Sequence, residues 1–258
     1  MFGDYVSKNI IFGEMAEWTI APVLKTGGPK GPGGSNPSLS ATNIIFKRMK
    51  LLTEMANKFG TDKGSNFSEG HSYTEFYDDF FQQFKNQEEI NILEVGVLDG
   101  MSLKMYNEYF NGHCNIYGLD IDNKSHLDTE NIKTFIVDQG SAEQLDNFKQ
   151  TIGDMKFDII IDDGSHQLRH QQLTLYKFHD LLKPNGIYIL EDLHTFVWGS
   201  KVESPLYSLV FNERFAYLSD TENTELREKI NTVNIWSFYN KKSPYCNSSI
   251  TSVITFKN

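Results

Sequence analysis

The feature that most constrains the fold of this chain is a series of five short apolar runs, each with an acidic residue at or next to its end. The runs span residues 90–95, 115–120, 134–138, 157–162 and 186–192. Stretches with helical periodicity lie between them, near 102–110, 141–152 and 167–182. Strands that alternate with helices predict an α/β fold with a mostly parallel sheet covered on both faces. Ligands of such sheets bind beyond the carboxyl ends of the strands, so the acidic residues are expected to share one rim.

The residues on either side of this series predict a cap and a sheet edge. Apolar residues recur at helical spacing over 46–59, and an aromatic stretch follows over 73–84. Two β-like runs, 233–239 and 250–256, predict an antiparallel hairpin. We therefore expect residues 42–258 to form a single domain in which 42–86 are a helical cap or lid.

The first forty residues have a different character. Residues 27–37 read GGPKGPGGSNP, a composition that forms neither a helix nor a strand core. Codons for 34–36 can read GGTTCGAAT, which resembles the T-loop of a transfer RNA, and codons for 22–27 can form a stem around a TGA anticodon loop. We predict that residues 1–41 are an unstructured extension, as a mistranslated transfer-RNA gene would be, with Met49 as a candidate start of the functional protein.

The charge balance narrows the class of partner. The chain has 24 Lys and Arg against 34 Asp and Glu, a net charge of −10, which argues against a nucleic-acid substrate. No apolar run approaches the roughly 18 residues of a membrane span, and the start lacks the pattern of a secretory signal. We therefore expect a cytoplasmic protein without a membrane partner.

A glycine turn follows the first apolar run. Residues 94–100 read EVGVLDG, and glycines at such a turn let a ligand approach the backbone. The spacing is not GxGxxG, which argues against a dinucleotide. Asp120 ends the next run, where a carboxylate can accept hydrogen bonds from a ribose. The alternative is that these residues only shape and cap turns.

Carboxylates gather at the ends of the last two runs. The fourth run continues as DDGSH, with Asp163 and His166, and the fifth as EDLH, with Glu191 and Asp192. Neighbouring strands would bring three carboxylates together, and their mutual repulsion favours a divalent cation. Oxygen ligands select Mg²⁺ or Mn²⁺. His166 lies beside them, although it could also be only a residue at the start of a helix.

These motifs resemble known enzymes. Glu-x-Gly-x-x-x-Gly followed by a strand that ends in Asp resembles the class I S-adenosylmethionine-dependent methyltransferases. The resemblance implies a Rossmann-like sheet. It also implies a set of residues that bind S-adenosyl-L-methionine: Glu94, Gly96, Gly100, Asp120, Asp138, Gln139 and Ser141.

DDGSH followed by EDLHT, with KFGTDKG and HSYTEFY upstream, resembles the metal-dependent macrolide sugar O-methyltransferases of the mycinamicin and tylosin type. The likeness spans about residues 47–195. It implies that Asp163, Glu191 and Asp192 bind Mg²⁺ or Mn²⁺ and that His166 is the general base. It also implies that the loop with Lys63, His71 and Tyr73 forms a lid; an ordinary solvated loop is the alternative.

The expected function is methyl transfer from S-adenosyl-L-methionine to a hydroxyl of a sugar or glycosylated small molecule. A metal ion stabilises a developing alkoxide while an imidazole takes the proton. Alternatives are the same chemistry on a catechol-like or other non-sugar diol, a nicotinamide-dependent oxidoreductase, and a non-catalytic binding module. A homo-oligomer is compatible with the sequence. Residues 196–215, including Trp198, are candidates for shaping the acceptor pocket, and His194 for contacting substrate.

Overall fold

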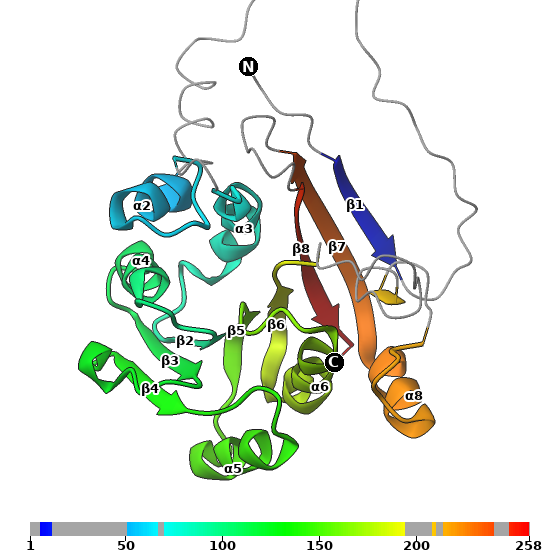
Figure 1. Ribbon diagram of the computed structural model, residues 1–258. Coiled ribbons are helices and arrows are strands. Elements are labelled where there is room, and N and C mark those ends of the chain that lie inside the picture. The colour runs from blue at the N-terminus through cyan, green and yellow to red at the C-terminus, as the bar shows by residue number, and fades with distance from the viewer. Residues whose placement is uncertain are drawn as a thin grey trace, which may run out of the picture.

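The computed structural model describes residues 6–11, 51–66, 70–193, 208–209, 214–239 and 248–257. They form one eight-stranded sheet in the order β1-β7-β8-β6-β5-β2-β3-β4 (Figure 1). The strands are β1 Val6–Ile11, β2 Ile90–Val95, β3 Cys114–Asp120, β4 Ile132–Ile136, β5 Phe157–Asp162, β6 Leu182–Leu190, β7 Ile230–Tyr239 and β8 Ser248–Phe256. The helices are α2 Leu51–Phe59, α3 Tyr73–Phe81, α4 Met101–Tyr109, α5 Ala142–Ile152, α6 Leu168–Phe178 and α8 Asp220–Lys229.

The centre of the sheet is parallel. Strands β4, β3, β2, β5 and β6 all pair in parallel, so their carboxyl ends lie at one rim. Strands β8 and β7 continue the sheet beyond β6 in antiparallel pairing. The predicted mostly parallel sheet with an antiparallel edge is therefore confirmed.

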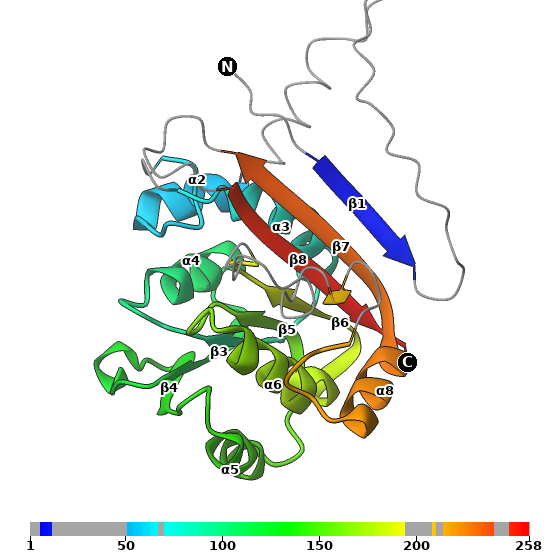
Figure 2. The same cartoon turned by 45° about the vertical axis from the view of Figure 1, so that its right-hand side comes forward.

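Helices cover the sheet on both faces, as Figures 1 and 2 show. Helices α2, α3 and α4 contribute to one apolar cluster, which includes Ile92, Ile159 and Ile189 from one side of the strands. Helices α5, α6 and α8 contribute to a second cluster on the other side, with Leu93 and Ile160. The central strands read as continuous apolar runs because both of their faces are buried.

The segment before β2 lies over the sheet next to its rim. Helix α3 presents aromatic side chains to the antiparallel strands: the rings of Phe76 and Trp236 stack with centroids 6.3 Å apart. The Tyr77 hydroxyl lies 2.9 Å from Thr251 Oγ1 on β8. In the part of this segment that the structure describes, a helical cap thus rests on the C-terminal strands.

The N-terminal extension differs in part from the expectation. Val6–Ile11 pairs antiparallel with β7 as the last strand of the sheet, so the prediction of no structure is wrong for these residues. An edge strand presents a row of unpaired N–H and C=O groups, and a short β-branched segment such as VSKNII can satisfy them. Residues 12–50 lie outside the described part of the chain.

The fifth parallel strand begins earlier than its apolar run. Residues 183–186 read KPNG, a sequence typical of a turn, yet β6 starts at Leu182. Its pairing with β5 shifts register between Phe157 and Ile159, so the turn residues form an irregularity within the strand.

Among the described helices, none has both the length and the apolar character needed to cross a bilayer.

Candidate active site at the carboxyl rim of the sheet

Strand register brings the predicted site residues together. Val95 of β2 pairs with Asp162 of β5, and Asp162 pairs with Leu190 of β6. The next residue along each strand is therefore Gly96, Asp163 and Glu191. The Asp163 N–H donates to the Val95 carbonyl at 2.9 Å, and the Glu191 N–H donates to the Asp162 carbonyl at 3.0 Å. The ends of these strands are thus fixed relative to one another by backbone hydrogen bonds.

A buried lysine stands among the carboxylates. The Lys63 ammonium donates hydrogen bonds to Asp163 Oδ2 and, at 2.8 Å, to Glu191 Oε2, and it lies 3.7 Å from Glu94 Oε1. Burial alone would lower the pKa of Lys63, but Asp163 and Glu191 outweigh it and raise that pKa well above the ordinary value. The lysine is therefore charged and neutralises part of the acidic cluster.

The cluster contains more carboxyl groups than this lysine pairs with. Burial raises the pKa of Glu94 to about 7, although Lys63 and a hydrogen bond from Ser102 Oγ (2.6 Å) oppose the rise. Burial and Asp163 also raise the pKa of Glu191. Within the described residues, Glu191 Oε1 is buried and accepts no hydrogen bond. A carboxylate oxygen left in this state fits a site that receives a further cation.

Asp192 joins the rim to His166 and to the cap. The His166 Nε2 atom lies 3.3 Å from Asp192 Oδ2, and the Tyr73 hydroxyl donates to Asp192 Oδ1 at 2.7 Å. The backbones of His166 and Asp192 have φ of 56° and 55°, values that non-glycine residues rarely adopt. One ligand atom each from Asp163, His166 and Asp192 lies within 4.8 Å of the others, close enough to hold one metal ion.

The glycine turn after β2 is held by Asp120. The Asp120 Oδ2 atom accepts hydrogen bonds from the N–H groups of Val97 and Leu98, at 3.0 and 3.1 Å. Gly96 has φ of 88°, and a Cβ atom there would overlap the carbonyl oxygen of Asp163. Gly100 has φ of 75° and precedes α4. These residues shape the rim. The hydrogen bonds of Asp120 are those expected of a residue that caps a turn, which is the alternative role considered for it.

The other predicted cofactor residues lie after β4. The Gln139 amide donates to Asp162 Oδ1 at 2.6 Å and accepts from the Ser165 N–H at 2.9 Å. Asp138 Oδ1 accepts from the Gly140 N–H at 2.8 Å, and Ser141 caps α5. Gln139 thus connects this loop to the DDGSH turn, on the side of β5 opposite to Asp163.

The structure therefore separates the sequence-predicted residues into two groups. Asp163, Glu191 and Glu94 meet around Lys63, and Asp192 meets His166. The glycine turn, Asp120 and the residues after β4 border that centre and contact it mainly through the backbone. Sequence reasoning named Lys63 and Tyr73 only as lid residues. Their TDKG and HSY motifs mark them, but no local pattern shows that their side chains reach the carboxylates. His194 and Trp198 lie outside the described residues.

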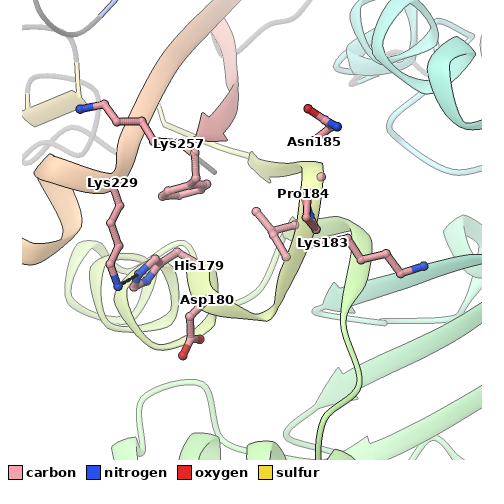
Figure 3. A pocket seen from close by; sticks show the side chains of 10 residues that line it. His179, Asp180, Lys183, Pro184, Asn185, Lys229 and Lys257 are labelled. Atoms are coloured by element: carbon pink, nitrogen blue, oxygen red, sulfur yellow. Dashed lines mark hydrogen bonds between the residues drawn. The ribbon is translucent and has the colours of Figure 1, made fainter.

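A hollow of about 200 Å³ lies elsewhere, at the start of β6 and the end of β8. Lys183 is paired with Asp158 at 2.7 Å, and Lys229 lies 3.2 Å from His179 Nε2. In Figure 3 the amines of Lys183 and Lys257 point away from each other, so they do not converge on one ligand. Because this end of β6 is opposite to Glu191, the hollow is not part of the candidate active site.

The fold and the rim define the class of structure, a class I methyltransferase fold. The MycE methyltransferase, solved in complex with Mg, S-adenosylhomocysteine and mycinamycin VI, is 28% identical with a TM-score of 0.62 over 80% of this chain and 53% of that one. A crystal form with Mg and S-adenosylhomocysteine alone gives a TM-score of 0.61 at 28% identity, over 80% of this chain and 55% of the other.

The sequences of curated relatives also support a methyltransferase fold. The chain is 37% identical over 154 residues to mycinamicin VI 2''-O-methyltransferase of Micromonospora griseorubida and 34% identical over 154 residues to demethylmacrocin O-methyltransferase of Streptomyces fradiae. Each match covers 57% of this chain and 37% of the relative, so the chain spans well under half of their length. No family model matches. The resemblance to the macrolide sugar O-methyltransferases is confirmed.

Proposed function

We propose that this protein transfers the methyl group of S-adenosyl-L-methionine to a hydroxyl of a sugar or glycosylated small molecule, with a divalent ion and His166 assisting. The observation that carries the proposal is the meeting of Asp163, His166 and Asp192 within 4.8 Å at the rim that also carries the glycine turn. The names of the curated relatives, which describe O-methylation of macrolides and rhamnosyl tetracenomycins, support the choice of a sugar hydroxyl.

The cofactor belongs on the β2–β4 side of the rim. Leu98, Ile121 and Ile136 follow or end these adjacent strands and are 75%, 66% and 62% exposed. Apolar side chains exposed beside a strand end mark a surface that a ligand covers. The Asp120 carboxylate and the backbone of the glycine turn supply polar contacts beside them. When bound, S-adenosyl-L-methionine supplies a methyl group that is already activated, because its leaving group is a neutral thioether.

His166 is the proposed general base. Its side chain is 37% exposed, but Nε2 faces Asp192 and Nδ1 is buried, so the ring must turn before an acceptor hydroxyl can meet Nδ1. Asp192 holds the Nε2 side of the ring and is itself held by the Tyr73 hydroxyl. This arrangement orients the imidazole and stabilises the imidazolium that forms when it takes the hydroxyl proton.

Asp163 and Asp192, with Glu191 beside them, would hold the ion. A divalent ion bound there would lower the pKa of an acceptor hydroxyl. Mg²⁺ prefers oxygen ligands, which leaves the imidazole of His166 available as a base. Zinc would instead recruit the imidazole as a ligand. We therefore expect Mg²⁺ or Mn²⁺ to support turnover and Zn²⁺ to inhibit it.

The test is methyl transfer from labelled S-adenosyl-L-methionine to a panel of acceptors. Glycosides with a vicinal diol should be methylated, and matched glycosides that lack any vicinal diol should not. EDTA should abolish the transfer, and Mg²⁺ should restore it. Turnover of catechols without turnover of glycosides would contradict the sugar assignment. Tight NAD(P)H binding without S-adenosyl-L-methionine binding would contradict the methyltransferase itself, as would cofactor binding with no turnover on any diol.

A further inference from the structure

Lys63 has an unusual position for a residue in a polar loop. Only 2% of its side chain is exposed, although lysines normally keep their amine in water. Its ammonium contacts carboxylates at the ends of three different strands: Asp163 after β5, Glu191 after β6 and Glu94 within β2. Burial of this charge requires partners that compensate for its lost hydration, and the three carboxylates provide them.

The loop that carries Lys63 is firmly supported. The Lys63 carbonyl accepts hydrogen bonds from the N–H and the Oγ1 hydroxyl of Thr74, both at 3.1 Å. The His71 N–H donates to the Asp62 carbonyl at 2.8 Å, and the Ser72 N–H donates to the Gly64 carbonyl at 3.0 Å. These bonds tie the described part of the loop to α3, so it presents the ammonium from a defined backbone.

The ammonium occupies the same carboxylates that a divalent ion would use. Asp163 belongs to the candidate metal cluster, and the second oxygen of Glu191 is buried without a hydrogen bond in the described structure. Two cations that share these carboxylates repel each other over a few ångströms in a partly buried site. An ion therefore binds more weakly with the lysine in place than without it.

We propose that Lys63 is a positioning residue, an internal cation that holds Asp163 and Glu191 and competes with the divalent ion for them. The inference rests on the proposed metal site. In the metal-free protein Lys63 stabilises the facing carboxylates and keeps the cap docked on the rim. In the loaded protein it lowers the affinity for the ion.

The decisive measurement is Mn²⁺ binding by electron paramagnetic resonance in Lys63→Met. The variant should bind Mn²⁺ at least tenfold more tightly than the unmodified protein. Unchanged or weaker binding would overturn the inference, because a merely structural lysine would leave the affinity unchanged or lower it. The matched control is Lys58→Met. Lys58 lies on the same cap and pairs with Glu108 at 2.6 Å on the surface, so its loss should leave the affinity within twofold.

A second variant distinguishes loss of the ion pair from a general loss of folding. Lys63→Met leaves buried carboxylates without their cation and should lower the melting temperature in EDTA. The double variant Lys63→Met with Glu191→Gln should regain part of that loss, because one of the unpaired charges is gone. Additive losses from the two single changes would overturn the pairing.

Cofactor titration in the same samples separates this inference from the proposed function. If S-adenosyl-L-methionine binds while neither protein binds Mn²⁺, the competition and the metal site are both refuted, and the cofactor assignment stands. If S-adenosyl-L-methionine does not bind, the proposed function is refuted, and the unfolding measurements still decide whether Lys63 and Glu191 act as a pair.

Discussion

At the scale of single residues, the candidate site depends on how three kinds of side chain are held. Carboxylates come from the strand ends, an imidazole comes from the turn after β5, and an ammonium comes from the cap. Tyr73 links the cap to the imidazole, because its hydroxyl bonds to Asp192 and Asp192 contacts His166. The chemistry of each group is thus set by a neighbour that is distant in the sequence.

Replacing His166 by alanine tests its role as base. Loss of a general base should lower turnover by about 10²–10⁴-fold. Affinity for S-adenosyl-L-methionine should remain, because the proposed cofactor contacts lie on the β2–β4 side. Turnover by single-turnover assay and affinity by calorimetry check both expectations. His113→Ala, at an exposed position, is the control. Unchanged turnover in His166→Ala would remove the base from the mechanism.

Glu94 should make stability depend on pH. Its pKa is raised from 4.5 to about 7. A carboxyl with a raised folded pKa binds protons more strongly in the folded state, so its contribution to stability falls as pH rises through this interval. The free energy of unfolding should therefore fall by up to about 3 kcal/mol over this pH interval. Urea unfolding in EDTA between pH 4.5 and 7.5 should show this loss in the unmodified protein and a smaller one in Glu94→Gln. A profile in Glu94→Gln identical to the unmodified one, or altered equally by exposed Glu143→Gln, would contradict the assignment.

At the scale of elements, the rim is built by turns that pack against each other. The glycine turn after β2 lies against the DDGSH turn after β5, with Gly96 touching the carbonyl of Asp163. The loop after β4 reaches the same turn through Gln139. Each turn therefore limits the positions that its neighbour can adopt.

Two glycines with positive φ provide a matched comparison of this packing. Gly96→Ala adds a Cβ that overlaps the Asp163 backbone, whereas Gly153→Ala, with φ of 60°, adds one that meets nothing within 4 Å. Gly153→Ala should cost about 1–3 kcal/mol, because its backbone, with φ of 60° and ψ of −128°, is one that residues other than glycine rarely adopt. Gly96→Ala should cost about 3 kcal/mol or more and should weaken Mn²⁺ binding. Thermal unfolding and Mn²⁺ titration of both variants check this; equal losses would show that the contact does not matter.

The elements and the acidic strand ends could be predicted because they are encoded locally. Apolar runs of strand length report burial, and parallel strands must end at one rim, so the sequence alone was enough to place Asp163 and Glu191 together. Lys63 could not be placed in this way, because its burial depends on how the loop between α2 and α3 lies over β5 and β6. The bond from Gln139 to Asp162 is also beyond local patterns, since it joins the loop after β4 to the end of β5, 23 residues away.

At the scale of the whole molecule, the extension and the methyltransferase fold can be separated experimentally. Deletion of residues 1–41 should leave affinity for S-adenosyl-L-methionine within twofold, because the described contacts of the rim involve none of these residues. It should also uncover the edge of β7, which β1 covers. We expect more self-association by analytical ultracentrifugation. A large loss of cofactor affinity would show that the extension supports the site.

The C-terminal strand β8 is inserted between β6 and β7, and it meets the cap behind the rim. His71 Nδ1 lies 2.7 Å from Ser249 Oγ, and the Leu193 N–H donates to the Ile250 carbonyl at 3.0 Å. These contacts join residues up to 178 positions apart. A nascent chain therefore cannot complete the surroundings of Asp192 until β8 has left the ribosome, and the site should form only after all strands of this sheet have been synthesised.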